Sequence, residues 1–197
     1  MGRATGEPTG PAVGRVEAAF GAAGGEGLSF AARVVGAVRL DPAAWDEIAC
    51  ERGALAQAAL VVLLAAGASV TAAAHIAGPG AALESAIGSL ASWPLIAGLL
   101  AGAARVLGHR LPFGTGLRLV GFAMAPLVLI GLAALRIDYV EAVVRMVALA
   151  LFFAGLVAGT RQALGVETMR AALVCAGAGL GLVLMTMVAV ALSVSAA

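Results

Sequence analysis

Five long apolar segments dominate the pattern of hydrophobic and polar positions along the chain. Each is long enough to cross the hydrocarbon core of a bilayer, which takes about 20 apolar residues in a helix. The pattern predicts an all-α membrane protein, a bundle of five transmembrane helices over about residues 54–76, 84–107, 116–135, 138–160 and 168–194. Pro94 and Pro126 lie inside the second and third segments, where we expect kinks because proline removes a backbone hydrogen bond.

Two shorter amphipathic stretches precede the first span. Residues 28–40 carry apolar side chains at helical spacing and arginines on other faces: Phe30, Val34, Val35 and Val38 against Arg33 and Arg39. Asp41-Pro42 predicts the start of a second helix, over 42–53, because Asp caps free N–H groups and Pro tolerates the first turn. Trp45 is then expected at headgroup depth as an interfacial anchor. The pattern allows these helices to lie on lipid or to pack on the bundle.

The composition agrees with a membrane protein, and the N-terminal segment differs in composition from the rest of the chain. The chain is 62% hydrophobic and 12% charged, against about 25% charged residues in soluble domains. A net charge of +1 argues against nucleic acid as the main partner. Residues 1–27 are rich in Gly, Ala and Pro and lack the apolar core of a secretory signal, so we expect a flexible cytoplasmic tail.

Arginine placement predicts the orientation, since cytoplasmic loops carry an excess of basic residues. With the N-terminus in the cytoplasm, ten of the twelve basic residues fall inside; Arg136 falls outside and Arg145 within the fourth span. Five spans then leave the C-terminus outside. The expected location is the bacterial cytoplasmic (inner) membrane.

The sharpest polar constellation lies at the start of the fourth span. In a helix, Asp138, Glu141 and Arg145 share one face, and Glu141 precedes Arg145 by four residues, the favourable order for an ion pair. Charges inside spans are costly and often functional. Two interpretations stay open: a path for a proton, ion or substrate, and an ion pair near the outer surface.

A second charged group, Arg161, Glu167 and Arg170, falls between the fourth and fifth spans. The pattern predicts a cytoplasmic turn in which Gly165 ends one helix and Thr168 caps the next. These charges are candidates for docking a cytoplasmic partner.

Three glycine pairs have the GxxxG spacing that brings membrane helices together: Gly98/Gly102, Gly155/Gly159 and Gly177/Gly181. Either packing inside the bundle or a dimer face would explain them.

No pattern indicates a catalytic, cofactor or metal site. The sequence has no nucleophile paired with a base, no phosphate-binding loop and no metal-ligand cluster. Cys50 and Cys175 are too far apart in the sequence to form a paired motif. We therefore expect a protein without enzymatic activity and without a cofactor.

Three segments carry a family resemblance: AARVVGAVRLDPAAW before the first span, GHRLPFGTGLRLVGFAMAPLVL at the third, and ALFFAGLVAGTRQALGVETMRAALV between the fourth and fifth. Over residues 28–195 the chain resembles the bacterial branch of the Yip domain family (Ypt/Rab-GTPase-interacting proteins). The resemblance implies a five-helix membrane domain with a cytoplasmic N-terminus. Eukaryotic members act in vesicle traffic through prenylated Rab GTPases, but their DLYGP-type motif has no counterpart here, so GTPase binding is not expected.

Together these features favour a non-enzymatic membrane scaffold, accessory or adaptor protein. Its expected partners are the lipid bilayer and either another membrane protein or further copies of this chain. The alternative is a small transporter or channel that uses Asp138, Glu141 and Arg145.

Overall fold

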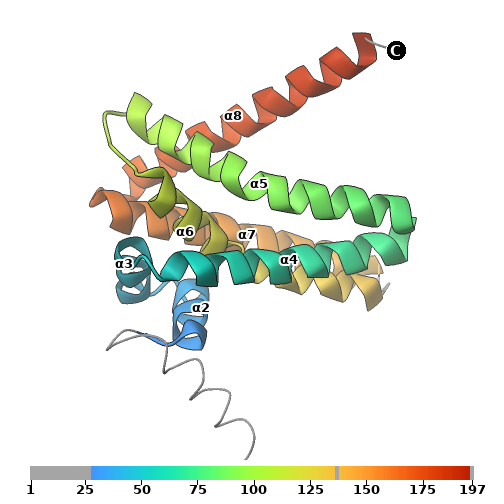
Figure 1. Cartoon of the computed structure of the whole chain (residues 1–197), viewed down its shortest axis with the longest axis horizontal. Coiled ribbons are helices and arrows are strands. Elements are labelled where there is room, and N and C mark those ends of the chain that lie inside the picture. Colours follow the sequence, from blue (N-terminus) through green and yellow to red (C-terminus); the bar gives the residue numbers. More distant parts are fainter. Residues whose placement is uncertain (1–27, 136–137, 196–197) are drawn as a thin grey trace, which may run out of the picture.

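The structure is a computed structural model that describes residues 28–135 and 138–195, and every element in these ranges is helical (Figure 1). The elements are α2 (Phe30–Val38), α3 (Pro42–Cys50), α4 (Ala54–Ala77), α5 (Pro79–Val106), α6 (Phe113–Ala123), the 3-10 helix η1 (Ala125–Leu135), α7 (Asp138–Leu164) and α8 (Thr168–Ser195). The expected tail, residues 1–27, lies outside the described residues. The predicted all-α class is confirmed.

Five segments are long and apolar enough to cross a membrane, as predicted: α4, α5, α6 with η1, α7 and α8. α4 and α5 form a hairpin, α6 and η1 pack along α4, and α7 packs on α6 and η1, while α8 crosses α5 and its C-terminal part runs away from the bundle (Figure 1). The helices alternate in direction, so α4 and α8 begin where α5 and α7 end. We call this end, which carries Arg52, Arg105, Arg161 and Arg170, the arginine-rich end.

The two prolines inside the spans have different consequences. α5 begins at Pro79 and continues through Pro94 as one helix. The third span changes from α-helix to 3-10 helix after Ala123, just before Pro126. Pro126 has no N–H to donate to the preceding turn, which favours a change of helix type at this point.

The N-terminal helices pack on the bundle, the second of the two arrangements that the pattern allowed. α3 contacts α6 and α7, and Trp45 and Ile48 are fully buried. The predicted start of α3 is confirmed: Asp41 is the N-cap, its Oδ1 accepts a hydrogen bond from the Ala43 N–H at 3.1 Å, and Pro42 opens the helix.

The face that α2 buries agrees with the predicted one only in part. Its buried residues are Arg33, Gly36 and Ala37, whereas Val35 is 47% exposed. The reason is close helix contact: a Cβ added to Gly36 would lie 2.5 Å from the Cβ of Ala44. Two helices that approach this closely meet through small residues. Val35 and Val38 therefore stay exposed, whereas Phe30 and Val34 are partly buried against the core.

The glycine pair of α7 also serves packing inside the bundle. A Cβ at Gly155 would lie 3.3 Å from the Trp45 ring, and one at Gly159 would lie 2.7 Å from it. α4 and α6 meet in the same way, since a Cβ at Gly121 would lie 2.7 Å from the Cβ of Ala58.

Candidate functional site

A buried arginine forms the centre of the strongest polar network in the described part of the chain. Arg33, in the middle of α2, is 2% exposed. Among the described residues only Arg33 and Thr160 are buried and polar or charged. An arginine is rarely this deeply buried unless acidic or polar partners satisfy its donors.

The partners of Arg33 come from α3, from the turn after it and from α4. Its Nη2 donates to Glu47 Oε1 at 2.7 Å and its Nε donates to the same oxygen at 3.2 Å. Nη1 donates to Gln57 Oε1 at 2.7 Å, and Nη2 also forms an ion pair with Glu51. The planar guanidinium thus engages three acceptors at once, a geometry that Arg provides and Lys does not.

The network extends to α6 through Glu51. Arg118 Nη1 donates to the backbone oxygen of Glu51 at 2.5 Å, and its Nη2 donates to Thr115 Oγ1 at 3.0 Å. The network also reaches the residues just before α2, where Glu47 Oε1 accepts a hydrogen bond from the Leu28 N–H at 2.7 Å. These bonds connect α2, α3, α4 and α6 at the arginine-rich end. Because the Glu47 and Glu51 carboxylates already accept from arginine, the network is suited to holding the helices together rather than to proton transfer.

Sequence reasoning missed this network and placed Arg33 only on a different face of its helix from the apolar residues. The available signal was the spacing of Glu47 and Glu51, four residues apart and therefore on one face of a helix that follows α2 directly. Gln57 adds a third polar group near the start of an otherwise apolar span.

The predicted cluster in the fourth span is present in part. Arg145 Nη2 donates to Glu141 Oε1 at 2.5 Å. The Arg145 side chain is 53% exposed and that of Glu141 33% exposed, so the pair lies on the outer surface of the bundle. Asp138 opens α7, but its side chain lies outside the described part of the chain.

The turn between α7 and α8 follows the predicted outline. Gly165 has a φ of 60°, its N–H donates to the Gln162 oxygen at 3.3 Å, and the Val166 N–H donates to the Arg161 oxygen at 3.3 Å. This is the Schellman pattern, in which a glycine in the left-handed region ends a helix. α7 runs on to Leu164, so Arg161 lies in its last turn. Thr168 is the first residue of α8 and not its cap: the Ala171 N–H donates to the Glu167 oxygen at 3.1 Å, which puts Glu167 in the cap position. The three candidate docking residues, Arg161, Glu167 and Arg170, are all exposed.

The expectation that Trp45 contacts lipid headgroups is wrong. Its side chain is 0% exposed and lies against Gly155 and Gly159 of α7. The ring fills the space that these glycines leave, and it anchors α3 to the bundle instead of to the bilayer.

The described residues show no candidate metal site, and the buried cysteine among them is engaged in a hydrogen bond. No group of three His, Cys, Asp or Glu side chains there is placed to hold a metal ion. The buried Cys175 Sγ donates to Thr160 Oγ1 at 3.6 Å, which satisfies two polar groups between α7 and α8.

Comparison with known protein families gives a match over most of the chain. The Yip1 domain model matches residues 36–190, which include α3 to α7, the last three residues of α2, most of α8 and the partners of Arg33 on α3 and α4, but not Arg33 itself. Comparisons with curated proteins and with solved structures give no significant match. The match covers well over half of the chain and agrees with the five-helix architecture. The chain is therefore a multi-pass membrane protein that belongs to the Yip1 domain family.

Proposed function

We propose that this protein is a non-enzymatic membrane scaffold or adaptor of the bacterial inner membrane, with its arginine-rich end in the cytoplasm. The observation that carries the proposal is the apolar interior of the spans. Within the described residues, the buried side chains of α4 to α8 are apolar apart from Thr160 and the Cys175 thiol that bonds to it, and Thr160 lies near the arginine-rich end. A transport path needs polar groups inside the membrane, so this interior favours a protein that holds partners over one that conducts solutes.

The N-terminal helices supply a surface for such a partner. The Arg33 network and Trp45 fix α2 and α3 on the bundle, while Val35 and Val38 of α2 are exposed. An exposed apolar patch on a rigidly held helix resembles the surfaces that proteins use for association. Binding there requires little ordering of the protein, which reduces the entropic cost of association.

In-cell crosslinking of the full-length protein followed by mass spectrometry tests this proposal. We expect a reproducible set of neighbours that crosslink to α2 and to the α7–α8 turn. Val35→Ser should weaken those crosslinks, because it removes apolar surface from a residue that is already 47% exposed. The matched control is Tyr139→Ser at the opposite end, where the side chain is 88% exposed. A protein that stays a lone monomer with no reproducible neighbours would contradict the scaffold role.

The transporter alternative has weaker support. Its strongest feature, the Glu141–Arg145 pair, lies on the outer surface of α7, whereas coupling residues of transporters face the interior or a water-filled cavity.

A further inference from the structure

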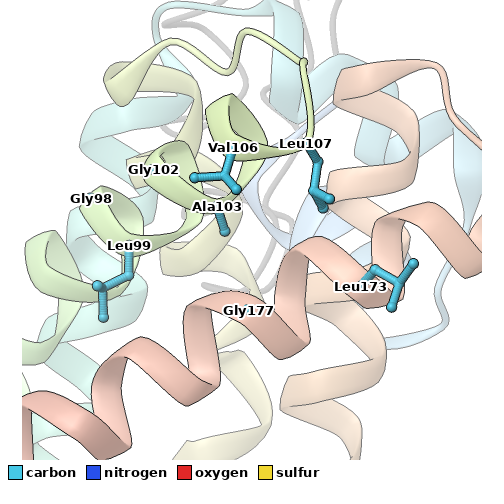
Figure 2. Close-up of a pocket in the computed structure, with 8 residues that line it drawn as sticks. All are labelled: Gly98, Leu99, Gly102, Ala103, Val106, Leu107, Leu173 and Gly177. Carbon is cyan, nitrogen blue, oxygen red and sulfur yellow. The ribbon is translucent and has the colours of Figure 1, made fainter.

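An apolar groove of about 450 Å³ lies between α5 and the N-terminal half of α8. Figure 2 shows its lining of small residues and aliphatic side chains, with Gly98 to Leu107 along α5 and its end and with Leu173 and Gly177 on α8. The helices touch where a Cβ at Gly177 would lie 3.4 Å from the Cβ of Ala103. At Gly102, in contrast, an added Cβ would meet no atom within 4 Å, so the groove is open there.

The groove faces outward between two membrane-spanning helices. Leu173 is 54% exposed and Val106 is 87% exposed, so a lipid chain can enter the groove from the side. The volume falls in the range of small-molecule sites, roughly 300–1,000 Å³.

One end of the groove is basic. A second cavity, of about 230 Å³, is lined by Leu107, His109, Arg170 and Leu173. Leu107 and Leu173 line both cavities, so the apolar groove continues directly into the basic pocket. Arg170 has no ion pair with any described residue and is exposed, which leaves its guanidinium available to an anion.

His109 is held in this pocket by the backbone. Gly108, just after α5, has a φ of 81°, and the His109 N–H donates to the Ala104 oxygen at 2.8 Å. This Schellman turn brings the loop back beside the first turn of α8. The two basic side chains therefore come from different helix ends and line one pocket.

We propose that this groove and pocket form a binding site for one anionic phospholipid. An acyl chain lies along Gly98, Gly102 and Gly177, and the phosphate lies against Arg170 and His109. The depth fits, because the pocket is at the arginine-rich end, where the spans leave the bilayer. Basic pockets between membrane helices at such a boundary suit acidic headgroups, and arginine binds phosphate through two parallel hydrogen bonds.

Charge argues for a lipid over a second copy of the chain as the occupant. In a membrane dimer related by a two-fold axis along the bilayer normal, equivalent residues lie at the same depth. Contact through this groove would bring the Arg170 guanidinium of one copy close to that of the other. The two described cavities contain no acidic lining residue to offset that repulsion.

Native mass spectrometry tests the site on the full-length protein in detergent, with equal amounts of phosphatidylglycerol and phosphatidylethanolamine added. We expect one retained phosphatidylglycerol. Gly102→Leu should lower its retention at least tenfold, because the new side chain fills the open groove. Gly67→Leu in α4 is the matched control, since a Cβ at Gly67 also meets no atom within 4 Å but lies outside the groove.

The headgroup contact has its own pair of variants. Arg170→Gln should remove the preference for phosphatidylglycerol over phosphatidylethanolamine, whereas Arg161→Gln, an equal loss of charge at the same end, should leave it unchanged. Both residues are exposed, so neither change should prevent folding.

Three results would overturn the proposal. The first is equal lipid retention by the wild type, Gly102→Leu and Arg170→Gln. The second is binding of inorganic phosphate by a wild type that retains no phosphatidylglycerol, which would indicate an ion site without a lipid chain. The third is a dimer that Gly102→Leu dissociates while lipid retention stays constant, which would identify a second copy as the occupant.

Discussion

The indole ring of Trp45 lies against Gly159, so closely that a Cβ on the glycine would be 2.7 Å from Cε3 of the ring. This contact joins α3 to α7, although the two residues lie more than a hundred positions apart in the sequence. A methyl group at Gly159 must displace the ring or separate the helices, because no real Cβ tolerates such a distance.

Gly159→Ala is therefore expected to lower the free energy of unfolding by about 1–3 kcal/mol, the usual cost of overpacking a core. Thermal unfolding in detergent, followed by tryptophan fluorescence, measures it. Gly67→Ala is the control, because a Cβ there meets open space, and it should leave the melting temperature unchanged or slightly raised. An unchanged melting temperature for Gly159→Ala would show that α3 is not held tightly on α7.

A double-mutant cycle isolates the contact. Trp45→Phe removes part of the ring that faces Gly159, so Gly159→Ala should cost less in that background than in the wild type. The expected coupling free energy is about 0.5–3 kcal/mol. Strictly additive losses would mean that the two residues act independently.

Arg33→Gln should destabilise the docking of α2. The shorter amide cannot satisfy Glu47, Glu51 and Gln57 together, and bonds of this kind to charged groups contribute about 1.5–3 kcal/mol. Because the Glu47 and Glu51 side chains are 25% and 39% exposed, water compensates in part and the lower half of that range is expected. Limited proteolysis after α2 and thermal unfolding both report the change.

Arg39→Gln is the matched control for Arg33→Gln. Arg39 belongs to the same short segment but is exposed, so its replacement should shift stability by less than about 0.5 kcal/mol. Equal effects of the two substitutions would mean that the buried network contributes no more than a surface charge does.

The sequence was sufficient to predict the spans because each is a continuous apolar run, and the bilayer thickness alone sets the length required. Local signals were also sufficient for Asp41 as a helix cap and for Gly165 as a helix end, since both depend on a few neighbouring backbone groups. The burial of Arg33 and Trp45 was not predictable in this way. It depends on which helix packs beside them, and Gly155 and Gly159 lie more than a hundred positions away from Trp45. Helical periodicity identifies a polar face but not the partner that covers it.

Substitution of the Glu141–Arg145 pair distinguishes the scaffold from the transporter. Arg145→Ala removes a partly exposed ion pair, and such pairs contribute about 0–1 kcal/mol at exposed sites in water. We expect no solute or ion flux through the wild-type protein in proteoliposomes, and no change in Arg145→Ala. Flux through the wild type that falls in Arg145→Ala would support the transporter and count against the scaffold.

The native cysteines provide a test of orientation without foreign tags. Cys50, at the end of α3, is exposed, whereas Cys175 in α8 is buried. If the arginine-rich end faces the cytoplasm, a membrane-impermeant maleimide should label the protein in inverted membrane vesicles but not in intact spheroplasts. Cys50→Ser should abolish the labelling, because Cys175 is shielded by the bundle.

The reciprocal variant makes the orientation test complete. In the Cys50→Ser background, Tyr139→Cys places a thiol at the opposite end of the bundle, where the native side chain is 88% exposed. It should react in intact spheroplasts and not in inverted vesicles. The positive-inside bias of ten basic residues against two predicts this pattern, since basic loops resist translocation across the membrane. Labelling of Cys50 from outside would reverse the orientation and place the Arg33 network, the α7–α8 turn and the basic pocket on the outer side.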